Sequence, residues 1–136
     1  MDTQTKGRAS ADGTVTVGSL KEARNVGVAV TKVIVHEDGK PDITLFRRVI
    51  DGDVQGLVGV DCRIGINIRV PKNAIIACGS VVEGDIVVCE KALIVHSQIR
   101  GACEIDPGAV LNDACVSGAD KSMRVYRDMM AFCREE

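Results

Sequence analysis

The chain has 136 residues, enough for one hydrophobic core but too few for two ordinary domains. Its 17 lysine and arginine residues are balanced by 19 aspartate and glutamate residues without a run of one sign, and the net charge of −2 argues against a nucleic-acid or anionic-membrane partner. Hydrophobic residues make up 46% and aromatic residues only 2%, so we expect a core of Val, Ile, Ala and Cys.

The chain begins with a polar stretch. Residues 1–13 contain almost no large apolar side chain, so they cannot offset the entropy lost on ordering, and we expect a disordered tail. Residues 14–18 are compatible with a short strand. Ser19, followed by Glu22 three residues later, matches a capping box and predicts one helical turn.

A β-hairpin is predicted for residues 26–46. Valines alternate with small residues from 26, turn residues fill 36–42, and alternation resumes over 43–46, which places Asp38 and Gly39 near the tip. Arg47 and Arg48 follow directly. Adjacent residues on a strand point to opposite faces, so these arginines do not converge into an anion site, and we expect both to be solvated.

Residues 58–70 alternate strictly between apolar and polar side chains, which indicates strand structure with one buried face. Two interpretations stay open, because the segment is long for one side of a coil. It either bends at Gly59 and Gly65 or forms one straight strand that ends before Pro71, which has no N–H to donate. We expect an irregular, hairpin-containing β region over 14–64 and regular coils over 65–118.

The strongest pattern is an internal repeat in residues 73–118. Three triplets, VEG, IRG and VSG, begin at Val82, Ile99 and Val116, at 17-residue steps. Further positions align at the same step: Ile76, Leu93 and Val110, and also Val88 and Ile105. A second period places an aliphatic residue at every sixth position: Ile75, Val81, Val87, Leu93, Ile99, Ile105 and Leu111.

A unit of about 17 residues fits three short strands joined by bends, which together close one triangular coil. Each coil then buries its apolar side chains by stacking on the next. Gly84, Gly101 and Gly118 fall where the chain must turn. One long buried helix is the alternative, but the glycines and the density of Val and Ile argue against it. The sequence therefore predicts a mainly β protein with a short single-stranded β-helix.

After Gly118 the spacing becomes helical. Asp120 can cap a helix. The apolar residues that follow recur at spacings of one and four residues: Val125, Tyr126, Met129, Met130 and Cys133. We predict an amphipathic helix over 119–136 that packs on the same domain and caps the open end of the β-helix. A partner-binding helix is the alternative, and Val125, Met129 and Met130 are the predicted self-association residues.

Catalytic, metal and cofactor motifs are absent from the sequence. The six cysteines form no CxxC pair and have no neighbouring histidine pair, so they lack the spacing of tetrahedral zinc sites, and we expect them to serve as small core residues. No apolar run reaches the roughly 18 to 20 residues of a transmembrane helix, and residues 1–11 are not signal-like. We expect a cytoplasmic protein without a metal or cofactor.

The repeats resemble those of a known family. Residues 80–86 (SVVEGDI), 92–95 (ALIV), 99–105 (IRGACEI) and 107–110 (PGAV) are similar to the coils of bactofilins, which are bacterial cytoskeletal proteins. This resemblance implies a right-handed β-helix that polymerises end to end without nucleotide.

Residues 105–110 (IDPGAV) and the six-residue period also resemble the hexapeptide acyltransferases. That resemblance implies a left-handed β-helix, a trimer, and a general-base histidine at a subunit interface beside acyl-CoA. His96 lies within the coils and is the candidate base, although a coil-corner histidine can equally be a solvated surface residue. His36 is the only other histidine, so the three ligands of a gamma-class carbonic anhydrase zinc site are not available.

The function predicted from these patterns is that of a non-enzymatic structural or interaction module. A narrow solenoid with exposed strand edges buries further apolar surface when its ends or faces pack together, so we expect a homo-oligomer. A trimeric hexapeptide-type acyltransferase with His96 as general base is the alternative.

Overall fold

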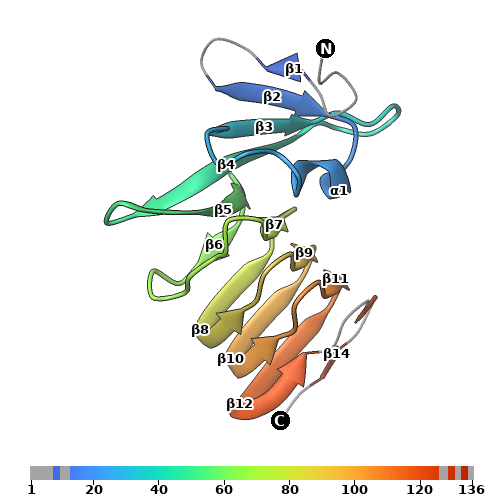
Figure 1. Ribbon diagram of the computed structural model, residues 1–136. Coiled ribbons are helices and arrows are strands. Elements are labelled where there is room, and N and C mark those ends of the chain that lie inside the picture. The colour runs from blue at the N-terminus through green and yellow to red at the C-terminus, as the bar shows by residue number, and fades with distance from the viewer. Residues whose placement is uncertain (1–7, 10–12, 126–128, 131–132, 135–136) are drawn as a thin grey trace.

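A computed structural model describes residues 8–9, 13–125, 129–130 and 133–134, with the side chains of residues 13–116. The fold is mainly β, as predicted, and contains a β-solenoid with about 17 residues per turn (Figure 1). The strands of this described part lie in two sheets, one of nine strands and one of five. The larger sheet runs through the N-terminal strands and along one side of the solenoid, so it joins the two regions.

The N-terminal region consists of β1 (Arg8–Ala9), β2 (Thr14–Val17), α1 (Leu20–Ala23), β3 (Lys32–Val35), β4 (Ile43–Ile50) and β5 (Asp53–Gly59). β1 is antiparallel to β2, β2 and β3 are parallel, and β3, β4 and β5 pair in antiparallel order. The predicted hairpin is confirmed, with Val33 opposite Leu45. Its first strand begins at Lys32 and not at residue 26, because residues 26–31 form a loop in which the Val30 N–H donates to the Gly27 carbonyl.

The predicted capping box is also confirmed. The Ser19 hydroxyl accepts a hydrogen bond from the Glu22 N–H at 3.1 Å, and the Glu22 carboxylate accepts one from the Gly18 N–H at 2.8 Å. The first bond satisfies a helix N–H group that would otherwise have no partner, and the second holds the residue before the N-cap. Ala23, at the end of this helix, is buried in the core.

The solenoid region consists of β6 (Arg63–Ile64), β7 (Ile75–Ala77), β8 (Val81–Val88), β9 (Leu93–Val95), β10 (Gln98–Ile105), β11 (Val110–Asn112), β12 (Cys115–Val125), β13 (Met129–Met130) and β14 (Cys133–Arg134). Each strand pairs in parallel with the equivalent strand of the next coil. Strands of the nine-stranded sheet alternate along the chain with strands of the five-stranded sheet, of which β8, β10 and β12 are the long ones.

The register confirms the 17-residue repeat. Val82, Ile99 and Val116 are stacked in β8, β10 and β12. The step from β7 to β9 is one residue longer, because Ile75 pairs with Leu93. The predicted alignment of Ile76 with Leu93 is therefore wrong by one residue.

The segment 58–70 bends, as the first of the two interpretations predicts. β5 ends at Gly59 in the larger sheet, and β6 lies in the smaller sheet, so the chain turns a corner between them. Coil-like parallel pairing already begins at Leu57 and Val58, which lie opposite Ile75 and Ile76.

The long strands of the smaller sheet contain stacked glycines. Gly84, Gly101 and Gly118 pair in register within β8, β10 and β12. Gly84 and Gly101 have φ angles of +106° and +95°, which side chains rarely allow. A Cβ atom on Gly84 would lie 2.3 Å from the Gly101 carbonyl oxygen, so glycine is required for the coils to stack.

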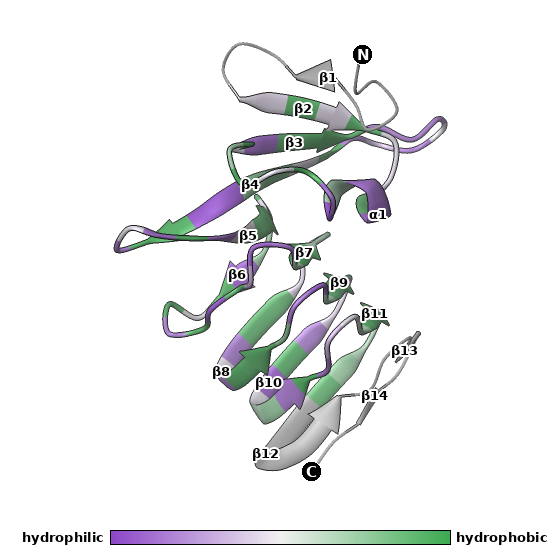
Figure 2. Cartoon of the chain, viewed as in Figure 1, coloured by the Kyte–Doolittle hydropathy of each residue, from purple (hydrophilic) through white to green (hydrophobic). Residues whose placement is uncertain are grey.

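Two apolar clusters form the core, one on each face of the larger sheet. Ile76 and Ile94 point into the solenoid interior, whereas their neighbours Ile75 and Leu93 pack with the N-terminal strands. Figure 2 shows that β7 and β9 are hydrophobic, and all of their residues are buried, which fits a sheet covered on both faces. The residues of the six-residue period therefore do not all point into the solenoid interior. Val87, which is part of that period, is 50% exposed on the outer face of β8.

Arg47 is buried, so the expectation that it is solvated is wrong. It is 9% exposed, although it lies within strand β4. The guanidinium donates to four carbonyl oxygens, those of Gly27, Val30, Gln55 and Lys72, at 2.8–3.2 Å. Arg48 donates elsewhere, to the Gly65 carbonyl at 2.9 Å, so the two arginines do not converge. Arg47 therefore links the 26–31 loop, β5 and the first coil.

The predicted C-terminal helix is wrong for the described residues of 119–136. These residues form the end of β12, β13 and β14, and they continue the solenoid: Ile105 lies opposite Val125, and Leu111 lies opposite Met129. Pairing with the preceding coil overrides the local helical spacing. Residues 126–128, 131–132 and 135–136 lie outside the described residues. The predicted tail also lies outside them, except for β1 and Gly13.

Candidate functional site

Two buried serines, Ser80 and Ser97, stabilise the corner next to His96. The Ser97 N–H donates to the Ser80 hydroxyl at 3.1 Å, and the Ala114 N–H donates to the Ser97 hydroxyl at 3.1 Å. These bonds satisfy buried N–H groups where the chain leaves the larger sheet. The residues just before this corner, Cys78 and His96, have left-handed backbones with φ of +61° and +51°.

His96 lines an open hollow between this corner and the β3–β4 turn. The hollow has a volume of about 290 Å³, and Thr44, Val60, Asp61 and Cys78 also line it. A carboxylate that orients the imidazole is the usual partner of a general base. Asp42 also lines this hollow, but its carboxylate is hydrogen-bonded to His36, and no hydrogen bond of His96 is found within the described part of the chain. His96 is exposed, so its geometry corresponds to the solvated surface histidine and does not favour the acyltransferase alternative.

The cysteines near this hollow are not activated nucleophiles. Burial raises the pKa of Cys78, and the charges of Asp61 and Glu37 raise it further. Burial raises the pKa of Cys62 and of Cys103 to about 11. A thiol with a raised pKa is protonated at neutral pH and reacts slowly. Of the described cysteines, Cys103 is buried in the solenoid interior as expected, whereas four are only partly buried: Cys62, Cys78, Cys89 and Cys115.

The other histidine does have a carboxylate partner. His36 Nδ1 lies 2.7 Å from Asp42 Oδ1, and Nε2 lies 3.8 Å from Asp38 Oδ1. The hydrogen bond and charge of Asp42 raise the pKa of His36. The pair sits in the exposed turn between β3 and β4, so it can titrate with solvent but does not enclose a substrate.

The predicted self-association residues do not share a helical face. Val125 ends β12 in the smaller sheet, whereas Met129 and Met130 form β13 in the larger sheet. They therefore lie on the last two strands along the chain before β14. Their role in self-association stays a prediction.

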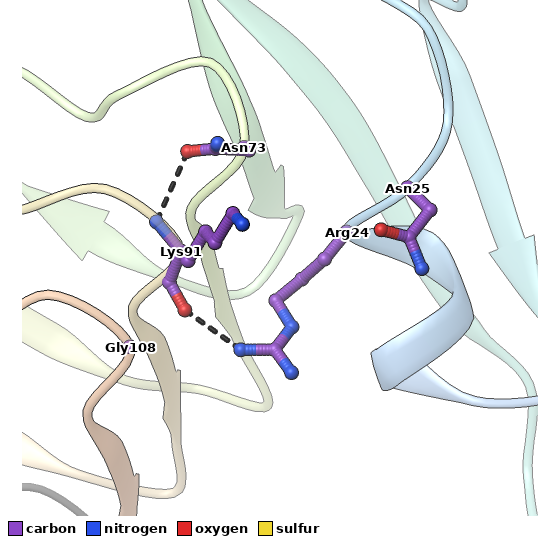
Figure 3. Close-up of a pocket in the computed structure, with 5 residues that line it drawn as sticks. All are labelled: Arg24, Asn25, Asn73, Lys91 and Gly108. Carbon is purple, nitrogen blue, oxygen red and sulfur yellow. Dashed lines mark hydrogen bonds between the residues drawn. The ribbon is translucent and has the colours of Figure 1, made fainter.

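A basic cleft lies where α1 meets the corners of the solenoid coils (Figure 3). Its volume is about 410 Å³, and its lining residues are Arg24, Asn25, Asn73, Lys91 and Gly108. Arg24 and Asn25 directly follow α1, whereas the other three occupy equivalent corners of successive coils at steps of 18 and 17 residues. The sequence analysis missed this cleft, because the repeat aligns the corners but gives no sign that α1 packs beside them.

Two hydrogen bonds fix the shape of the cleft. Arg24 Nη1 donates to the Lys91 carbonyl at 2.7 Å, and the Lys91 N–H donates to Asn73 Oδ1 at 3.0 Å (Figure 3). Lys91 has a φ of +65°, which turns the chain at this corner. The described side chains that line the cleft include two cations and no carboxylate.

Within the described ranges, no three His, Cys, Asp or Glu side chains are grouped so that they could hold a metal ion. The helix of this part, α1, has four residues, and no helix there is long and apolar enough to cross a membrane. Compared with models of known protein families, with curated proteins and with solved structures, the chain has no significant match.

Proposed function

We propose that this chain is a non-enzymatic scaffold or interaction module that self-associates through the C-terminal end of its β-solenoid. The observation that carries the proposal is the difference between the two ends. At the N-terminal end, the larger sheet continues from β7 into β5, β4 and β3, so this side of the first coil is already paired. Among the described strands, β13 and β14 are the outermost members of their sheets at the other end.

An outermost strand offers unpaired N–H and carbonyl groups to a strand of another chain. Two identical C-terminal ends that pair around a two-fold axis form a closed dimer. Among the described strands of the solenoid, β6 is the outermost strand at the N-terminal end, so that end has one open sheet edge where the C-terminal end has two. A filament of the bactofilin kind instead requires two different open ends on every copy. The continuation of the larger sheet into β5 and β4 therefore favours a discrete dimer over a polymer.

The test is light scattering on a size-exclusion column over a range of concentrations. We expect a dimer for the unchanged chain and a monomer for Met129→Lys, because a lysine on an outermost strand opposes edge pairing. Val87→Lys is the matched control, since Val87 is half exposed on the flank of β8, away from the end, and its variant should remain dimeric. Circular dichroism checks that both variants are folded.

Three outcomes contradict the proposal. A monomer at the highest soluble concentration excludes self-association, and filaments in electron micrographs of the same fractions favour the polymerising alternative. A trimer revives the acyltransferase alternative. The next measurement is then acetyl-CoA binding by the unchanged chain and its loss in His96→Ala.

A further inference from the structure

We propose that the basic cleft between α1 and the coil corners binds a phosphate group, either inorganic phosphate or the phosphate of a small phosphomonoester. This inference goes beyond self-association, because the cleft lies on the flank of the coils and not at their C-terminal end. It rests on the charge, the donors and the size of the cleft.

The charge of the cleft is suited to a dianion. Arg24 and Lys91 each contribute one positive charge, and the described lining contains no carboxylate. Lys91 forms no ion pair with any described residue, although the protein as a whole carries more acidic than basic residues. A phosphomonoester carries nearly two negative charges at neutral pH, which matches this pair of cations.

The donors of the cleft are placed on both of its walls. Figure 3 shows the Arg24 side chain reaching from the α1 side and the Lys91 side chain rising from the coil corner beside Asn73. Only Nη1 of Arg24 is held by the Lys91 carbonyl, so the remaining guanidinium N–H groups can donate to an anion. The side-chain amide of Asn73 uses its oxygen for the Lys91 N–H, which leaves its NH₂ group as a donor.

The cleft is larger than a bare phosphate ion. A volume of about 410 Å³ falls within the range of small-molecule sites and exceeds the space that one phosphate ion fills. A phosphate group held between the two cations therefore leaves room for an organic substituent. Such a ligand would contact both walls and hold α1 against the coils.

The experiment is a titration of the ¹⁵N-labelled chain, followed by backbone amide chemical shifts, at constant ionic strength. Inorganic phosphate and glycerol 3-phosphate are the two probes, with acetate as the monoanionic comparison. We expect saturable shifts at Asn25, Lys91 and Gly108 with both phosphates and much weaker binding of acetate. Tighter binding of glycerol 3-phosphate identifies the organic phosphate as the ligand, and equal binding identifies the free ion.

Lys91→Gln is the informative variant, because it removes a charge but keeps the backbone carbonyl that Arg24 binds. We expect it to weaken phosphate binding by about tenfold, the loss typical of one charged hydrogen bond. Lys21→Gln, the same change on the exposed side of α1, is the control and should change affinity by less than about twofold. Shifts that fail to saturate, or equal weakening by the two variants, would overturn the proposal.

Discussion

The solenoid coils and the N-terminal strands are stabilised in different ways. The coils repeat the same contacts at each level: Val82, Ile99 and Val116 stack in one register, and glycines stack beside them. The N-terminal strands are joined to the coils by the β5–β7 pairing, by a shared apolar cluster and by contacts that occur once, such as the four hydrogen bonds of Arg47. Repetition distributes stability over many similar residues, whereas a single contact concentrates it in one side chain.

Gly84→Ala tests the repeated contacts and should have the largest effect. An alanine there combines a φ of +106° with a Cβ 2.3 Å from the Gly101 oxygen, so neighbouring coils must separate. We expect a loss of about 2 to 5 kcal/mol in the free energy of unfolding, from backbone strain and steric overlap together. Chemical denaturation followed by circular dichroism measures this loss.

Gly39→Ala is the control that separates the two causes. Gly39 also has a positive φ, +81°, but nothing lies within 4 Å of its added Cβ atom. This variant should lose only the strain, about 1 kcal/mol. If Gly84→Ala is no worse than Gly39→Ala, close stacking of the glycine corners does not limit the fold.

Arg47→Met tests the single contacts. Methionine has a similar length and no donors, so the variant removes the donor from the buried Gln55 carbonyl and from the partly buried Lys72 carbonyl. We expect a loss of about 2 to 4 kcal/mol in the free energy of unfolding. Hydrogen exchange in the variant is compared with that in the unchanged chain. A larger increase in residues 26–31 than in the coils would show that the loss of stability begins at this junction.

Arg48→Met is the matched control, because it makes the same change at the next residue. Arg48 donates one hydrogen bond, to the Gly65 carbonyl, so its loss should cost about 1 kcal/mol or less. Equal losses in the two variants would contradict a special role for Arg47.

The repeated part of the fold could be predicted from the sequence, because repetition leaves its period in the residues. The triplets at Val82, Ile99 and Val116 predict the observed register, and the corner glycines follow from the same alignment. Local signals were equally reliable where the contact itself is local, as in the capping box of Ser19 and Glu22. Alternation over 58–70 predicted one buried face, but only Ile68 and Val70 of that face are buried, whereas Val60 and Ile66 are exposed because the chain bends.

The remaining features depend on contacts between distant residues. Arg47 looked like a solvated arginine because its acceptors are backbone carbonyls, which no sequence pattern marks. The helical spacing of Val125 and Met129 was real, but pairing with Ile105 and Leu111 decides the structure there. The basic cleft was missed for the same reason, since Arg24 and Lys91 meet only when α1 packs against the coils.

The β3–β4 turn offers a finer test of a single contact, with a small effect that depends on pH. Asp42 raises the pKa of His36 above its usual 6.5, so the ion pair contributes fully below pH 6.5 and is lost as the pH rises through the higher folded-state pKa. Asp42→Asn should lower the pKa of His36, measured by NMR titration, and remove this pH dependence from the hydrogen exchange of residues 36–42. Asp38→Asn should lower the pKa less, because Asp38 is 3.8 Å from the imidazole and Asp42 only 2.7 Å. If Asp42→Asn leaves the pKa of His36 unchanged, the turn is held by its backbone alone and the ion pair is incidental.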